Sequence, residues 1–275
     1  MTPFRASARF TDRWGHFRLE IDDFVARLTF DRPDRLNALT FQTYADLRDL
    51  LAELPNRDDV RVLVLTGTGR GFCSGGDVNE IIGRLLEMEP GDVLDFTRMA
   101  GAVVQLMRES PLPIIAAVNG IAAGAGAAIA LAADFRIVAR SASFSFLFTR
   151  VGLAGADMGS AYLLPRIVGL GRATELLMLG ERVDAERAVG MGLAGSLVED
   201  HELSERSSEL ARRLAEGPAL AYASTKMLLS RELDIGLPAA IELDAVTQAL
   251  LMRTDDHAEF YRSFRQGREP KWAGR

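Results

Sequence analysis

Cysteine and lysine are scarce in this chain of 275 residues. Cys73 is the only cysteine, so the chain cannot form an internal disulfide, which favours a reducing compartment and a cytoplasmic protein. Lys226 and Lys271 are the only lysines, and neither lies in a motif typical of a cleft, so Schiff-base chemistry has little support. The 3 histidines are far apart and lack metal-ligand spacing, so we expect no metal site. The first residues are mixed and polar and contain no apolar signal core.

Basic residues are also in the minority. The chain has 32 Lys and Arg against 38 Asp and Glu, which gives a formal net charge of −6. An acidic balance argues against a nucleic-acid partner, because such a partner favours a basic face. The remaining composition, with 48% hydrophobic and 25% charged residues, is that of an ordinary globular protein and excludes the collagen-like, disordered and disulfide-rich classes.

One uncharged stretch, from Ile114 to Ala133, has the length of a membrane span. Most of it is alanine and glycine, which are only weakly apolar, and Asn119-Gly120 is a turn signal. Pro113 and Asp134 bound the stretch. We therefore expect a buried strand, a turn and a buried helix, and no membrane partner.

Hydrophobic periodicity divides the chain into an α/β part followed by a helical part. Alternating or β-branched runs predict strands at Phe17–Glu20, Ala26–Phe30, Val60–Thr66, Ile114–Val118 and Phe135–Ala139. Helical spacing predicts helices at Phe41–Leu54, with Thr40 as cap, and at Val93–Met107 and Gly124–Ala133. After Gly152 almost everything is predicted helical: Met158–Val168, Ala173–Leu179, Ala185–Met191, Leu203–Ala215, Ala219–Leu233, Ile241–Leu251 and Ala258–Phe264. Strand–helix alternation in the first part predicts parallel βαβ units.

Two glycine-rich turns follow predicted strands. The segment Gly67–Asp77 fits neither the dinucleotide-binding fingerprint nor the phosphate-binding P-loop. The segment Asn119–Gly126 opens a helix, where free N–H groups favour a negative oxygen. Each turn alone is also explained by tight turns and close packing of small residues. Two such turns from separate strand ends could converge on one oxygen and form an oxyanion hole.

Several motifs occur in a fixed order between residues 17 and 274. They are Arg32–Leu39 (RPDRLNAL), Gly71–Asp77 (GFCSGGD), Ile115–Gly120 (IAAVNG), Ala133-Asp134, Leu164–Gly169 (LPRIVG) and Phe264–Gly274 (FRQGREPKWAG). In this combination the sequence resembles the crotonase, or enoyl-CoA hydratase/isomerase, superfamily. The resemblance implies an α/β fold with a ββα spiral core, here residues 1–198, and a C-terminal helical region, residues 199–275, that mediates trimerisation. It also implies a homotrimer or a dimer of trimers.

The same resemblance implies the ligand and the site. The ligand would be an acyl-CoA thioester, with coenzyme A as part of the substrate and no other cofactor. The N–H groups of Gly76 and Ala125 would hold the thioester oxygen. The substrate site and CoA channel would be lined by Arg35, Leu36, Ala38, Ser74, Gly75, Gly76, Asp77, Val78 and Phe148. Phe144, Phe146 and Phe148 suggest a roomy apolar pocket, although phenylalanines more often simply fill cores.

The chain departs from the hydratases at the acid–base positions. Hydratases of the superfamily have one glutamate three residues after the second oxyanion donor and another in the loop after the following strands. At these positions this chain has Ala128 and Phe148. Neither side chain can transfer a proton, so the usual activation of water by two carboxylates is excluded.

Asp157 is a different carboxylate, at the start of a predicted helix. One interpretation is a helix N-cap, which aspartate forms readily. The resemblance favours catalysis, because some isomerases of the superfamily place their single catalytic aspartate before the same Leu-Pro-Arg. Within the superfamily, the sequence resembles the ring-epoxide and enoyl-CoA isomerases of the phenylacetate pathway. Apolar surroundings would make the carboxyl group less acidic than in water, and we expect them to be Phe146, Phe148, Leu153 and Met158.

Other polar side chains are less convincing as catalysts. Asp77 and Asp134 are expected to be structural, and Tyr162 to pack in the core. Glu80 is the second-choice acid, and Cys73 lacks an evident histidine partner for nucleophilic catalysis. The first hypothesis is therefore an enoyl-CoA isomerase with one proton-shuttling aspartate. The alternatives are a hydratase with relocated acids (Asp157 with Glu80) and a non-catalytic CoA-binding scaffold.

Overall fold

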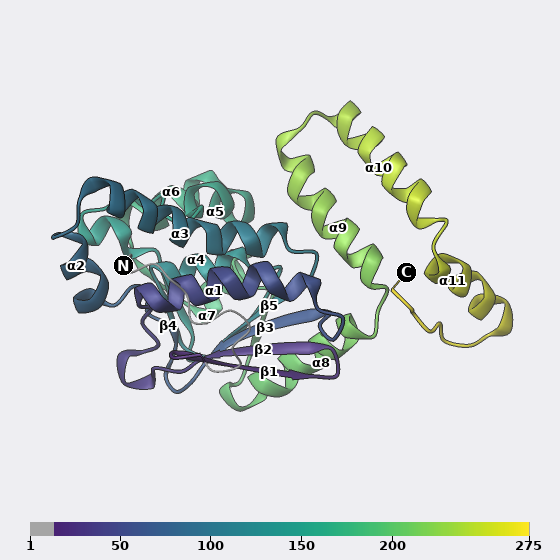
Figure 1. Ribbon diagram of the computed structural model, residues 1–275, viewed down its shortest axis with the longest axis horizontal. Helices are drawn as coiled ribbons and strands as arrows, with labels where there is room; N and C mark the ends of the chain where they lie inside the picture. Colours follow the sequence, from purple (N-terminus) through teal and green to yellow (C-terminus); the bar gives the residue numbers. More distant parts are fainter. Residues whose placement is uncertain (1–13, 275) are drawn as a thin grey trace.

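The computed structural model describes residues 14–274, in which two sheets are surrounded by helices (Figure 1). The larger sheet has 6 strands in the order β1-β2-β3-β5-β7-β10. Its strands β1 and β2 form an antiparallel hairpin, and the other pairs are parallel. The strand bounds are β1 Phe17–Asp22, β2 Val25–Phe30, β3 Val62–Gly67, β5 Ile114–Val118, β7 Phe135–Ala139 and β10 Ser196–Val198.

Both faces of this sheet are covered, which explains the continuous apolar run in β3. Val62 and Val64 pack on one face against α8 (Leu203–Ala215). Leu63 and Leu65 point to the other face, where they join the main core together with α1 and α3. Parallel strands buried on two sides need apolar residues at every position, whereas the edge hairpin needs them at alternate positions only. The alternating burial of β2 agrees with this.

The smaller sheet was not predicted from the sequence. It has 4 strands in the order β4-β6-β8-β9, and the β4–β6 and β6–β8 pairs are parallel. Each strand has only 3 residues, too few to show a periodic pattern. The bounds are β4 Gly71–Cys73, β6 Ile121–Ala123, β8 Ser143–Ser145 and β9 Arg182–Asp184. The prediction that almost everything after Gly152 is helical is therefore wrong for β9 and β10, where short strands join the two sheets.

The predicted helices are all present: α8 has the predicted bounds, and the others differ at one or both ends. Thr40 caps α1 as expected, since its hydroxyl accepts the Thr43 N–H at 3.2 Å. A π-helical turn, η3 (Val78–Ile82), precedes α2. The helix bounds are α1 Phe41–Glu53, α2 Gly83–Leu85, α3 Pro90–Glu109, α4 Ala125–Ala132, α5 Ser160–Val168, α6 Leu170–Leu179, α7 Ala185–Gly190, α8 Leu203–Ala215, α9 Ala219–Arg231, α10 Leu237–Leu251 and α11 Asp255–Gln266.

The uncharged stretch from Ile114 to Ala133 folds as β5, β6 and α4, and every residue of α4 is buried. The expected strand, turn and helix are present, and the short strand β6 lies between the turn and the helix. Among residues 14–274, no helix is long and apolar enough to cross a membrane.

The last three helices extend away from the two sheets (Figure 1). One buried ionic contact ties α9 to the sheets: Lys226 Nζ lies 2.8 Å from Asp134 Oδ2 and donates to the Leu112 carbonyl oxygen, also at 2.8 Å. Large apolar side chains remain exposed on these helices, including Leu229, Leu237 and Phe264. By contrast α8, which lies in the predicted C-terminal region, covers the larger sheet.

Candidate active site

The carboxyl ends of β4, β6 and β8 lie side by side because these strands pair in parallel. The Ser74–Gly76 turn follows β4, Gly124 and Ala125 follow β6, and Phe146–Phe148 follow β8. A Cβ atom at Gly75 would lie 2.9 Å from the Ala123 carbonyl oxygen and 3.3 Å from the Ala125 nitrogen. The two glycine-rich turns that the sequence analysis identified therefore meet in the structure.

Backbone geometry determines which N–H groups are available at this meeting point. Leu39 bridges Gly76: its N–H donates to the Gly75 carbonyl and its carbonyl accepts the Asp77 N–H, both at 2.8 Å. In a parallel bridge of this kind the N–H of the middle residue, Gly76, points to the opposite side. Ala125 is the first residue of α4, so its N–H has no acceptor within the helix.

The close approach of α4 to β4 requires glycine at position 126. A Cβ atom at Gly126 would lie 1.9 Å from the Cys73 carbonyl oxygen, so only glycine lets α4 pack directly on β4. Gly124 has φ +51°, which turns the chain from β6 into the helix. Gly124 and Gly126 are thus required by the turn and by close packing, and both place the Ala125 N–H at the site.

The loop predicted to line the CoA channel packs against the Ser74–Gly76 turn. Ser74 N–H donates to the Leu36 carbonyl at 3.0 Å, and Ser74 Oγ donates to the Arg35 carbonyl at 3.3 Å. Leu36 itself has a left-handed backbone with φ 48°. Ala38 is buried and Val78 is 66% exposed, so the predicted lining extends from the interior to the surface.

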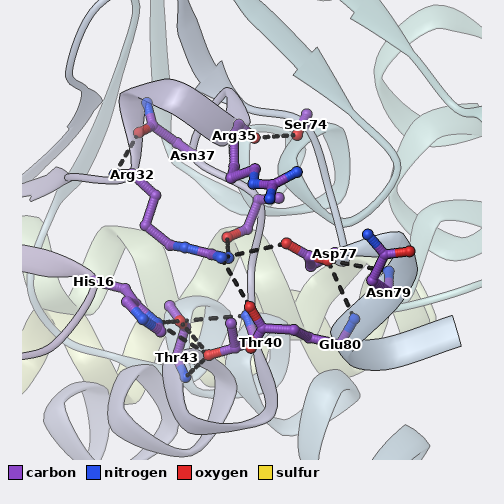
Figure 2. A network of polar contacts seen from close by, with 11 residues as sticks. His16, Arg32, Arg35, Asn37, Thr40, Thr43, Ser74, Asp77, Asn79 and Glu80 are labelled. Atoms are coloured by element: carbon purple, nitrogen blue, oxygen red, sulfur yellow. Dashed lines mark hydrogen bonds and ion pairs between the residues drawn. The ribbon is translucent and has the colours of Figure 1, made fainter. Parts of the chain in front are cut away.

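A polar network ties these two segments together (Figure 2). The Arg32 guanidinium donates to the Ala38 carbonyl at 2.7 Å and contacts Glu80 at 3.0 Å and Asp77 at 3.3 Å. Below it, His16 bridges the hydroxyls of Thr40 and Thr43 at 3.0 and 2.8 Å. The sequence alone predicted no role for Arg32 or His16, because their partners become neighbours only in the fold.

Asp77 is structural, as expected. Its Oδ1 accepts the N–H groups of Asn79 and Glu80 at 3.0 and 3.1 Å, which caps η3. Burial opposes ionisation, but these two N–H groups and the nearby Arg32 outweigh it, so the pKa of Asp77 lies below its ordinary value. Such an acid stays ionised and is a poor proton shuttle at neutral pH.

Asp157 is half-buried on the loop between β8 and α5. The N-cap interpretation is wrong, because Gly159 caps α5 and Asp157 Oδ1 accepts the Met158 N–H at 2.9 Å. Burial raises the pKa of Asp157 above its ordinary value, and the Met158 N–H offsets only part of the effect. Burial, with added contributions from Cys73 and Asp157, also raises the pKa of Tyr44. The Asp157 carboxylate therefore lies near enough to the Tyr44 hydroxyl to interact with it electrostatically.

Four residues were expected to surround Asp157, and the structure gives their burial. Phe146, Phe148 and Met158 are buried, whereas Leu153 is 58% exposed. Phe148 lies beside Gly124, where a Cβ atom would be 3.9 Å from its ring. Ala128 is buried within α4.

The other polar residues considered as catalysts, Cys73, Tyr162 and Asp134, differ in burial and in their partners. Burial raises the pKa of the Cys73 thiol to about 12, so it stays protonated and is no nucleophile at neutral pH. Tyr162 does not pack in the core: it is 40% exposed, its hydroxyl donates to Asp234 and Arg166 stacks over its ring. Asp134 is structural, since it accepts the Ile114 N–H at 2.8 Å and pairs with Lys226.

No group of three or more His, Cys, Asp or Glu side chains within residues 14–274 could hold a metal ion. Phosphate-binding and dinucleotide-binding motifs are also absent from the sequence. The structure brings together the backbone N–H groups of Gly76 and Ala125, at the ends of β4 and β6, with the buried Phe148 ring beside Gly124.

Comparison with known proteins gives the family. Residues 20–275 match the family Enoyl-CoA hydratase/isomerase. The 1,2-epoxyphenylacetyl-CoA isomerase of Escherichia coli (strain K12) is 35% identical over 255 residues, which covers 93% of this chain and 97% of that protein. A probable enoyl-CoA hydratase of Rhodobacter capsulatus is 38% identical over 258 residues, 94% of this chain and 98% of that protein.

Solved structures agree with the sequence match. A crystal structure from Streptomyces coelicolor A3(2), assigned to the enoyl-CoA hydratases, superposes with a TM-score of 0.95 at 61% identity and covers 100% of both chains. The enoyl-CoA hydratase of Bacillus anthracis gives a TM-score of 0.89 at 29% identity, covering 95% of this chain and 100% of that chain. The chain belongs to the enoyl-CoA hydratase/isomerase, or crotonase, family, whose members act on acyl-CoA thioesters.

Proposed function

We propose that the protein is an enoyl-CoA isomerase that moves the double bond of a 3-enoyl-CoA, or of a ring-containing analogue, to the 2-position. The N–H groups of Gly76 and Ala125 hold the thioester oxygen, and Asp157 transfers the proton. Coenzyme A is part of the substrate, and no further cofactor takes part. Supporting this proposal, a relative with 35% identity is named as an isomerase of a ring-containing acyl-CoA.

The chemistry needs one base and one anion site. The Asp157 carboxylate removes a proton from C2, and the electron pair of that C–H bond forms the enolate. Negative charge on the thioester oxygen is stabilised by the two N–H donors, each worth about 3 kcal/mol in comparable sites. The C3–C4 double bond then becomes C2–C3 as C4 takes the proton back from the Asp157 carboxyl group. No water molecule is consumed.

The single observation that carries this proposal is the placement of titratable groups. The two positions where the hydratases have glutamates are filled by Ala128 and Phe148, both buried, and neither can transfer a proton. Asp157 is half-buried with a raised pKa, which brings its proton affinity closer to that of a general acid–base group working near neutral pH. A shuttle that alternates between base and acid needs this property.

The test is turnover of a panel of 3-enoyl, 2-enoyl and ring-containing acyl-CoA thioesters by the wild type, Asp157→Asn and Asp49→Asn. We expect the wild type to convert 3-enoyl substrates. Asp157→Asn should lose at least about 10²-fold in kcat, because general acid–base catalysis supplies that much. Asp49→Asn is the matched control, since Asp49 is exposed and pairs with its neighbour Arg48. Wild-type activity in Asp157→Asn would remove Asp157 from the mechanism.

The hydratase alternative has support from the relatives described as enoyl-CoA hydratases. Its second acid, Glu80, is 53% exposed at the side chain and paired with Arg32, which makes it a weaker candidate. Formation of 3-hydroxyacyl-CoA from 2-enoyl-CoA would favour the hydratase. Absence of turnover on every thioester of the panel would favour the non-catalytic scaffold.

We also propose a homotrimer or a dimer of trimers, with contacts made by the C-terminal helices. The exposed apolar residues of α9–α11 support it, because large apolar surfaces on a chain of this kind mark interaction sites. Light scattering on the purified protein measures the mass directly. A monomer at micromolar concentration would contradict this part of the proposal.

A further inference from the structure

Arg32 is placed between the loop and the turn that form the candidate oxyanion site. Its side chain is only 15% exposed. One nitrogen, Nη1, donates to the Ala38 carbonyl at 2.7 Å, and the other, Nη2, contacts Asp77 Oδ2 at 3.3 Å and Glu80 Oε1 at 3.0 Å. A planar guanidinium can make these contacts at once because its donors are held in a fixed fork.

The main chain of Arg32 also organises the loop to which Ala38 belongs. The Arg32 N–H donates to Asn37 Oδ1 at 2.9 Å, and the Arg32 carbonyl accepts the N–H groups of Arg35 and Asn37. The Asn37 side chain in turn donates to the Gly71 carbonyl at 2.7 Å. Arg32 thus holds the Ala38 end of the loop while Asn37 attaches the same loop to β4.

The Gly76 donor lies between the two groups that Arg32 connects. On one side, Leu39 follows Ala38 and makes the backbone bridge to Gly75 and Asp77. On the other side, the Asp77 carboxylate has one oxygen on Arg32 and the other on the η3 N–H groups, so it fixes the chain immediately after Gly76 (Figure 2). A shift of Ala38 relative to Asp77 would therefore rotate the Gly76 N–H.

We propose that Arg32 is a positioning residue for the oxyanion site: its contacts with Ala38 and Asp77 fix the direction of the Gly76 N–H. The inference rests on the part of the proposed function that assigns the thioester oxygen to Gly76 and Ala125. Arg32 contacts no reacting atom in this role. Its charge is also balanced locally by two carboxylates, so geometry rather than net charge carries the effect.

The experiment measures hydrogen bonding to the carbonyl without requiring turnover. Butyryl-CoA labelled with ¹³C at the carbonyl is bound to each variant, and the infrared band of the bound carbonyl is recorded together with the dissociation constant. In the wild type we expect a shift to lower wavenumber on binding. In Arg32→Gln the shift should fall to less than half, and kcat should fall about 10²-fold, as expected for a catalytic group displaced by about 1 Å.

Two further variants isolate the contact. Asp77→Asn keeps an oxygen that can cap η3 and removes only the charge that faces Arg32, so we expect the same reduced shift. The double variant should be no worse than Arg32→Gln alone, because the contact that Asp77→Asn weakens is already lost in Arg32→Gln. Arg57→Gln is the matched control, since Arg57 is exposed and forms a surface ion pair with Asp59, and it should behave as the wild type.

The outcomes distinguish this inference from the proposed function. A full infrared shift in Arg32→Gln, or losses that multiply in the double variant, would overturn the positioning role. A wild type without any carbonyl shift would overturn it as well, because no oxyanion donor would then be in place. A wild type that shows the shift but no isomerase turnover would contradict the proposed function and leave the positioning role supported.

Discussion

Gly75 gives the sharpest test of how the two glycine-rich turns meet. Its φ of +96° lies in the region that favours glycine, and an added Cβ atom would be 2.9 Å from the Ala123 carbonyl oxygen. Gly75→Ala therefore combines backbone strain of about 1–2 kcal/mol with overpacking of about 1–3 kcal/mol. We expect the free energy of unfolding to fall by about 3 kcal/mol, which corresponds to a decrease in Tm of about 6–12 °C.

Activity should fall further than stability alone would explain. The same Cβ atom would lie 3.3 Å from the Ala125 nitrogen, so relief of the contact must separate the two turns that carry the donors. Misplacing one donor costs about 10²–10³ in kcat. The assays are thermal unfolding and turnover of 3-enoyl-CoA at a temperature where the variant remains folded.

Gly171→Ala is the matched control. Gly171 lies in α6 with no heavy atom within 4 Å of an added Cβ, so the same substitution should be neutral or stabilise by up to about 1 kcal/mol. Equal Tm and kcat for Gly75→Ala and Gly171→Ala would refute the close approach of the two turns.

Three further predictions follow from the same structure. Because burial raises the folded-state pKa of Asp157, the folded chain binds that proton more tightly than the unfolded chain, and ionisation costs stability as the pH rises above the ordinary aspartate pKa. Asp157→Asn should therefore raise Tm at neutral pH and leave it unchanged well below the ordinary aspartate pKa. An unchanged Tm at neutral pH would contradict this prediction. The Cys73 thiol, with a pKa of about 12, should resist iodoacetamide at pH 8 in the native state and react after denaturation. Mass spectrometry measures the alkylation, and alkylation of the native protein would disprove the burial of Cys73. Lys226→Met should lower the free energy of unfolding in urea by about 1–3 kcal/mol, because Asp134 loses one buried partner while it keeps its ion pair with Arg108 at 3.1 Å. Exposed Lys271→Met should change it by less than about 0.5 kcal/mol.

The sequence predicted the long elements because their signals are local. The Val-rich apolar run within Val60–Thr66 and the helical spacing of α1 depend only on neighbouring residues, and both elements are present. The order of motifs from Arg32 to Gly274 determined the family, and the residues Ala128 and Phe148 excluded the usual pair of glutamates. Ala128 and Phe148 have no ionisable group, so this conclusion holds whatever the fold.

Only the tertiary structure decided how the site is assembled. Strands of 3 residues have no periodicity, so β4, β6 and β8 exist because they pair with one another, and that pairing brings the two turns together. The positioning role proposed for Arg32 could not be predicted from the sequence for a related reason. One of its partners, Glu80, lies 48 residues away in the chain. Propensity and periodicity describe what each segment prefers, whereas contacts between distant segments follow from packing the whole chain.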